Sequence, residues 1–207
     1  RELLALYADM ESDPEAILPT TIGIQPQEAA CAASNTPQET PICEDWPFTN
    51  EKARNRQREA EAQYGCTPSD SPVIKTVTFG DGMTVEMVLV PAGAYVMGAA
   101  SGSTDEMPQC VVRIEEPFWM IRYEITNAQF AAFDPDHDSA VESKFSMQFG
   151  VRGFYVNGPD QPVVRISWEQ AMVFCDWLTT QTDETFALPT EAQWEYACRA
   201  GSDSAFF

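Results

Sequence analysis

The segment Phe186–Gly201, FALPTEAQWEYACRAG, constrains the fold more than any other part of the chain. Thr190 followed by Gln193 is a capping-box pattern, in which the two side chains satisfy free backbone N–H groups at a helix start. Pro189 prevents a longer helix from running through this cap, and Gly201 can end the new helix because glycine readily adopts a left-handed conformation. The segment therefore predicts one short, well-bounded helix.

A second capping box, Ser167 with Gln170, opens the run WEQAMVFCDWLTT. The apolar residues that follow recur at helical spacing, which predicts a helix with one buried face: Ala171, Phe174, Cys175 and Leu178. Large aromatic side chains flank both helix starts and can anchor a fold that is poor in regular structure. We therefore expect six structural anchors: Trp168, Trp177, Pro189, Thr190, Trp194 and Tyr196.

The middle of the chain reads as short strands. Two β-rich runs surround Gly80-Asp81-Gly82, which is a hairpin pattern. Further strands are expected over residues 94–98, 111–115 and 118–124. Thr126 or Asn127 can cap a short helix after them. Short helices and strands with long connections predict an irregular α+β domain over residues 73–207.

The N-terminal part has a different composition. Residues 1–49 begin with a short amphipathic pattern over 1–10 and then become rich in Pro, Thr, Ser and Gln, which predicts an extended arm with a short helix. Residues 50–72 predict a helix and a linker, because a helical run ends at Gly65.

That predicted helix carries one third of the basic residues of the chain: Lys52, Arg54, Arg56 and Arg58. In a chain with a net charge of −20, we expect these cations to pair within the protein, with Glu51, Glu59 and Glu61, rather than with nucleic acid.

Four blocks of the sequence, in this order, resemble the formylglycine-generating enzyme family, also called the sulfatase-modifying-factor domain: VLVPAGAYVMG, DEMPQCVVRIEEPFWMIRYEITNAQFAAF, QPVVRISWEQAMVFCDWL and ALPTEAQWEYACRAG. The resemblance runs from about Val73 to the C-terminus. The preceding run, WPFTNEKARNRQREAEAQYG, resembles the segment before this domain in some bacterial members. The resemblance implies the first half of a fold related in shape to C-type lectins.

The family's oxidase activity converts a sulfatase cysteine into formylglycine, in a reaction similar to that of copper-dependent oxygenases. The resemblance places the cysteine pair that does this, and most calcium ligands, in the C-terminal half of the domain. It therefore implies no catalytic and no cofactor-binding residue here, and copper only if that half is present. Cys175 and Cys198 match helix positions of the family, so we interpret them as small buried apolar residues, with a mutual disulfide or a reactive thiol as alternatives.

Two other groups of residues are weighed. The run DPDHD gathers Asp134, Asp136, His137 and Asp138, which is a candidate calcium or transition-metal site, although turns commonly contain the same residue types. The six cysteines form no CxxC pair, and the single histidine argues against a structural zinc site. A disulfide between Cys31 and Cys43 is a candidate tether in the Pro- and Thr-rich arm, and oxidising export predicts a periplasmic or extracellular location.

Two functions follow as hypotheses. A net charge of −20 argues against nucleic-acid binding, and no apolar run is long enough to span a membrane. The chain is either a non-catalytic binding or scaffold subunit, or a fragment of a formylglycine-generating or related oxidase whose catalytic cysteines lie in a C-terminal half. It could also be one half of a split domain. An exposed apolar face would then be covered by a protein partner or by the second half of the domain.

Overall fold

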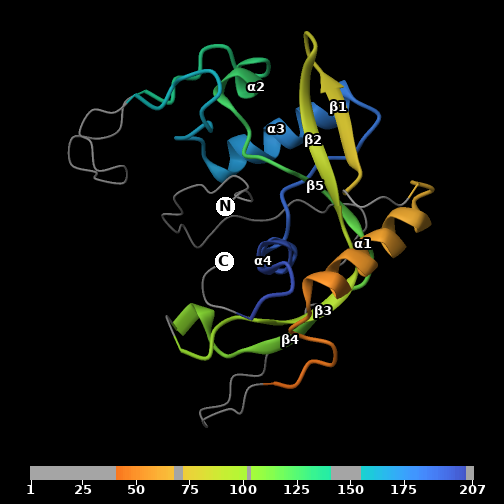
Figure 1. Cartoon of the computed structure of the whole chain (residues 1–207). Helices are drawn as coiled ribbons and strands as arrows, with labels where there is room; N and C mark the ends of the chain where they lie inside the picture. The colour runs from red at the N-terminus through yellow and green to blue at the C-terminus, as the bar shows by residue number, and fades with distance from the viewer. Residues whose placement is uncertain (1–40, 68–71, 102–103, 141–154, 204–207) are drawn as a thin grey trace.

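The computed structural model describes residues 41–67, 72–101, 104–140 and 155–203, and it confirms an α+β fold (Figure 1). Most of the predicted arm, including the helix predicted over 1–10, lies outside the described residues. The elements occur in the order α1 Asn50–Gln63, β1 Ile74–Phe79, β2 Met83–Val90, β3 Gly93–Met97, a 3-10 turn η1 Thr104–Glu106, β4 Cys110–Ile114, β5 Phe118–Ile121, α2 Asn127–Ala131, α3 Trp168–Gln181 and α4 Glu191–Arg199.

The strands form two small antiparallel sheets. The first has the order β1-β2-β5, and the predicted hairpin at residues 80–82 connects its first two strands. β5 joins the other edge of β2, with Met87 opposite Ile121 and Val90 opposite Phe118. The second sheet pairs β3 with β4. In Figure 1, α4 lies between the two sheets, and α3 lies behind the β1–β2 hairpin.

Each sheet packs against its own helices, so the described residues contain two core clusters. The larger cluster joins the inner face of β1 and β2 to α2 and α3, through side chains such as Phe79, Phe130 and Phe174. The smaller cluster joins the β3–β4 sheet to α4, through Tyr95, Ile114 and Tyr196. Because α4 contacts both β3 and β4, it fastens the second sheet in place.

Both predicted capping boxes are present, and Thr126, one of the two residues expected to cap the short helix, forms a third. Thr126, Ser167 and Thr190 each accept the N3 backbone N–H of their helix, and the N3 glutamine side chain accepts the cap's own N–H. The helix α4 ends at Arg199, and its C-cap, Ala200, is left-handed at φ 45°. Gly201 is needed for packing, because a Cβ there would overlap the ring of Phe48.

Two of the four cations of α1, Lys52 and Arg56, have an acidic partner other than the predicted ones. Lys52 forms its ion pair with Asp45, and the Arg56 Nη2 lies 4.0 Å from the Asp45 carboxylate. Glu61 is fully buried and accepts hydrogen bonds from Gln57 Nε2 at 3.1 Å and Val73 N at 2.8 Å. The acidic partner therefore comes from the turn before the helix, while Glu61 fixes the start of the segment that leads into β1.

Candidate functional site

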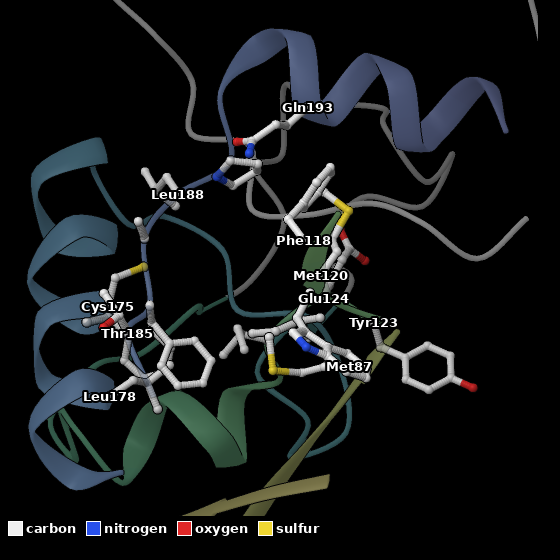
Figure 2. A pocket seen from close by; sticks show the side chains of 17 residues that line it. Met87, Phe118, Met120, Tyr123, Glu124, Cys175, Leu178, Thr185, Leu188 and Gln193 are labelled. Carbon is white, nitrogen blue, oxygen red and sulfur yellow. The ribbon is translucent and has the colours of Figure 1, made fainter. Parts of the chain in front are cut away.

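A pocket of about 220 Å³ opens at the edge of β5, between that strand and the connection from α3 to α4. Figure 2 shows Cys175 and Leu178 of α3 on one side, Phe118 and Met120 of β5 on the other, and Gln193 at the α4 end. Most of the lining side chains are apolar. The pocket therefore lies at the junction of the larger core with the first sheet and α4.

Few polar groups reach this pocket. Glu124 follows the end of β5, and its half-buried carboxylate has no hydrogen-bond or ion-pair partner among the described residues. Burial raises the pKa of the Glu124 carboxyl above its ordinary value. Gln193 uses its side-chain oxygen on the N–H of Thr190, which leaves its NH₂ group for the pocket. The site thus offers an apolar space with one carboxylate and one amide.

The two cysteines of the helices are both free thiols. Cys175 is 7% exposed, and burial raises the pKa of its thiol to about 11. Burial also raises the pKa of the half-buried Cys198 thiol. The interpretation of Cys175 as a small buried apolar residue is confirmed, and the alternative of a Cys175–Cys198 disulfide is wrong. Neither environment favours the thiolate that nucleophilic or metal-binding cysteines need.

An ion pair on α4 clamps the end of β3. Glu195 Oε1 accepts the Gly98 N–H at 2.9 Å and the Arg199 Nε–H at 2.7 Å. Arg199 Nη2 donates to the Gly98 carbonyl at 3.0 Å. The side chains are only 12% and 17% exposed for Arg199 and Glu195, respectively. The N–H and the carbonyl of Gly98 are therefore both held by a charged pair whose members lie 97 and 101 residues further along the chain.

A tyrosine pair completes the contact between α4 and the second sheet. Tyr95 is fully buried and donates its Oη to the Ala192 carbonyl at 2.9 Å. The neighbouring Tyr196 ring lies 5.3 Å away, centroid to centroid, and its buried Oη has no hydrogen-bond partner among the residues that the structure describes. Within the same described part of the chain, Arg56 Nη1 is also buried without a hydrogen-bond partner. A Cβ added at Gly93 would overlap Tyr196 Oη and lie 3.0 Å from Arg56 Nη1, so this crossing requires glycine.

The predicted metal site over residues 134–138 is not formed. Asp134 accepts the Asp136 N–H at 3.2 Å, which is a local turn. His137 Nε2 lies 2.9 Å from the Val164 carbonyl, and Asp138 accepts the Ala140 N–H at 2.8 Å, which lowers the pKa of the Asp138 carboxyl. Within the described ranges, no group of three His, Cys, Asp or Glu side chains could hold a metal. The hydrogen bonds therefore identify residues 134–138 as a turn.

The predicted disulfide between Cys31 and Cys43 is also wrong, because Cys43 is a free thiol. Cys43 is 8% exposed and its Sγ lies 3.7 Å from the Glu44 carbonyl, so packing rather than a covalent tether holds this turn. Cys31 lies outside the described residues. The disulfide-bonded cysteine among those described is Cys110, at the start of β4.

The six predicted anchors differ in how far the structure buries them. Trp177 is confirmed, since its ring packs against Phe79 and Phe174. Tyr196 is 3% exposed and Thr190 caps α4, as expected, while Pro189 and Trp194 are half-buried. Trp168 is 50% exposed, so the prediction that it anchors the fold is wrong.

Sequence reasoning missed the pocket and Glu124. Glu124 fell at the end of a predicted strand, and nothing in its neighbours marked it as a carboxylate facing an apolar space. The opposite wall of the pocket comes from α3 and from the 185–189 connection, which lie about fifty residues or more further along the chain. The contact between Glu195 and the Gly98 N–H was not predicted either.

Residues 73–207, well over half of the chain, match the sulfatase-modifying factor enzyme 1-like domain. The chain belongs to this family. The formylglycine-generating enzyme of Bos taurus is 27% identical over 237 residues, which covers 95% of this chain and 56% of that protein. The inactive C-alpha-formylglycine-generating enzyme 2 of Bos taurus is 28% identical over 161 residues, or 59% of this chain and 51% of that protein.

A solved structure shares the fold of this sulfatase-modifying-factor domain. PvdO from Pseudomonas aeruginosa superposes with a TM-score of 0.50 and 27% identity, over 67% of this chain and 55% of that chain. The chain spans about half the length of the curated relatives just named. Every helix in the described part of the chain is too short or too polar to cross a bilayer.

Proposed function

We propose that this chain supplies the architectural half of a sulfatase-modifying-factor domain and works as a non-catalytic binding or scaffold unit within a larger assembly. The observation that carries the proposal is the state of its thiols. Cys175 is buried with its thiol pKa raised to about 11, and Cys198 is shifted in the same direction. Copper–thiolate chemistry needs accessible thiolates, and these residues do not provide them.

The polar groups of α4 support the same proposal. Glu195 and Arg199 both hydrogen-bond to the Gly98 backbone. Tyr95 of β3 donates its hydroxyl to the Ala192 carbonyl of α4. A catalytic group needs a free donor or acceptor that faces a reacting atom. Here the charged pair holds a helix against a sheet, so we assign it a structural role.

The family contains precedent for a domain without activity, since one relative is named an inactive C-alpha-formylglycine-generating enzyme. The second candidate function is a fragment of an active oxidase, and the relative named formylglycine-generating enzyme favours it. In that case the reactive cysteines come from outside these 207 residues. Sequencing the coding region beyond Phe207 separates the candidates, because the oxidase requires a downstream cysteine pair.

The direct test is an activity assay on the full chain. We expect no formylglycine when the chain is incubated with Cu(I), oxygen and a cysteine-containing sulfatase peptide, with the peptide aldehyde measured by mass spectrometry. The Bos taurus formylglycine-generating enzyme is the positive control. Aldehyde formed by this chain above the level of a Cys175→Ala, Cys198→Ala variant would overturn the scaffold proposal.

We also propose that the protein works in an oxidising compartment, in the periplasm or outside the cell. The disulfide at Cys110 supports this location, because structural disulfides persist mainly in such compartments. Free-thiol counting of protein purified from its source, with and without reductant, tests the location. A fully reduced Cys110 in that material would contradict it.

A further inference from the structure

The strand β1 lies at an edge of the first sheet, and its outer side has no partner strand in the described ranges. Its register on β2 runs without a bulge from Ile74 to Phe79. Arg122 N donates to the Glu86 carbonyl at 2.8 Å, so the backbone groups of Glu86 face β5 rather than β1. Glu86 lies opposite Thr76, and the two residues of such a non-hydrogen-bonded pair turn their backbone groups away from each other. The N–H and C=O of Thr76 therefore point outward.

The same alternation turns the backbone groups of Ile74 and Thr78 outward, and the side chains of all three residues lie on the exposed face. Proteins usually protect an edge strand with a proline, a bulge or a charge that stands at the edge. β1 contains no proline, and its only charged residue, Lys75, has its Nζ 2.6 Å from Glu184 Oε1. That charge is used within the fold, so the described residues leave the outer edge of β1 open to another strand.

A polar groove of about 430 Å³ follows this edge. One wall is formed by β1, over residues 75–78, and the other by the end of α3 and the connection after it, over residues 180–184. In Figure 1 this connection passes beside β1. Side chains of an extended segment alternate between two faces, so a segment placed beside β1 would direct every second side chain toward residues 180–184. The groove thus offers backbone partners on one wall and side-chain partners on the other.

The charges of the second wall indicate which segment fits. Asp183 is exposed and has no ion-pair partner among the described residues, and the carboxylate of Glu184 is 40% exposed and shared with Lys75. The groove therefore holds two carboxylates and one ammonium group. The whole chain carries a net charge of −20, which repels an acidic segment. Charge complementarity therefore favours lysine or arginine at the positions that face Asp183.

We propose that the outer edge of β1 and this groove form a docking site for an extended, basic segment of another protein. The segment pairs antiparallel with β1, forms main-chain hydrogen bonds to Thr76 and Thr78, and sets basic side chains against Asp183 and Glu184. The main-chain bonds supply affinity and the carboxylates supply selectivity. The inference names the class of partner for the scaffold function proposed above, and in this respect it rests on that function.

The test uses the full chain and a synthetic peptide, acetyl-Thr-Lys-Thr-Lys-Thr-Lys-Thr-amide. When it pairs antiparallel with β1, its threonines lie beside Thr76 and Thr78, and its lysines face residues 180–184. We expect saturable one-to-one binding with a dissociation constant of about 1 mM or tighter by calorimetry. Hydrogen exchange measured by NMR should slow at the outward amides of Thr76 and Thr78 and stay unchanged at Val77, whose amide faces β2. No binding, or no slowing at Thr76 and Thr78, would overturn the proposal.

Two further peptides separate strand pairing from attraction by net charge. Methylation of the backbone nitrogens of the two central threonines removes the donors that face β1 and leaves the charge unchanged. This peptide should bind at least about tenfold more weakly, because main-chain hydrogen bonds are lost. A peptide with its lysines replaced by glutamate should not bind. Equal affinity for the methylated peptide would mean that the acidic chain attracts cations without a defined site, and the proposal would be refuted.

Variants of the protein locate the site. Thr76→Pro removes an N–H that points away from β2, which an edge strand tolerates, and it should abolish binding while the thermal melt stays cooperative. Asp183→Asn should weaken binding about fourfold, whereas Asp160→Asn in an exposed turn should leave it within about 1.5-fold. Undiminished binding by Thr76→Pro, or equal effects of the two aspartate variants, would contradict the assigned site. Should Thr76→Pro not fold, the methylated peptide decides whether the strand pairs.

The two proposals can fail independently. Absence of peptide binding would remove this docking site and leave the aldehyde assay unaffected. Formylglycine production by the chain alone would remove the scaffold function, whatever the peptide does.

Discussion

Replacing Glu195 with glutamine is expected to lower the free energy of unfolding by about 2 kcal/mol. Removing one partner of a buried ion pair costs about 3–5 kcal/mol, because the remaining charge is left uncompensated. Glu195 and Arg199 are 17% and 12% exposed, so solvent screens part of that cost. The glutamine oxygen can still accept the Gly98 N–H, which reduces the loss further.

Urea unfolding of the full chain at pH 7, followed by tryptophan fluorescence, measures this change. With a slope of about 2 kcal/mol per M, typical of a small protein, the midpoint should fall by about 1 M. Arg199→Met should cost a similar amount. Because the two residues act on one backbone unit, the double variant should lose at least about 1 kcal/mol less than the sum of the single losses.

An exposed pair provides the matched control. Arg122 Nη1 lies 3.2 Å from Glu86 Oε2, with side chains 38% and 45% exposed. Glu86→Gln removes the same charge and should cost less than about 1 kcal/mol. If Glu195→Gln costs no more than Glu86→Gln, or if the losses of the double variant are additive, the role assigned to the clamp is refuted.

Three further predictions concern the interior. Tyr95→Phe removes the donor to the Ala192 carbonyl and should cost about 1–2 kcal/mol in urea unfolding, whereas Tyr196→Phe should be neutral within about 0.5 kcal/mol; equal losses would contradict the bonding described. Gly93→Ala should cost about 1–3 kcal/mol by overlap with Tyr196 Oη, and adding Tyr196→Phe should restore most of the loss in thermal melts, so a failure to recover would refute the overlap. Burial raises the pKa of the Cys175 thiol from its ordinary 9.0 to about 11, so its contribution is complete below pH 9 and is lost as pH rises to about 11. Between pH 8 and pH 11 the chain should lose about 2–3 kcal/mol more stability than Cys175→Ala, and parallel pH profiles would contradict this.

The helix starts and the hairpin were accessible from sequence because their determinants are local. Ser167 and Gln170 are three residues apart, and they meet in any structure in which this helix forms. The same holds for the turn at residues 80–82. The family resemblance also depends on such local blocks, and the match over 73–207 confirms it.

The sequence carried less information on which side chains are buried and on which residues they contact. Trp168 has the helical phase of the buried Ala171 and Cys175, yet it is 50% exposed, because burial depends on what packs opposite. Cys43 was expected to need a disulfide, but the fold buries it as a free thiol. The acidic run at 134–138 has the composition of a metal site, and only its hydrogen bonds identify it as a turn.

The sequence alone determined the capped helices, the hairpin and the family, since interactions between residues within about four positions survive in every compact arrangement. Only the tertiary structure decided that Glu195 holds Gly98, that β5 pairs with β2, and that Glu124 lines an apolar pocket. These contacts join positions that the chain brings together by its whole path. Whether each contact forms therefore depends on every turn between the two positions, and no local sequence pattern predicts it.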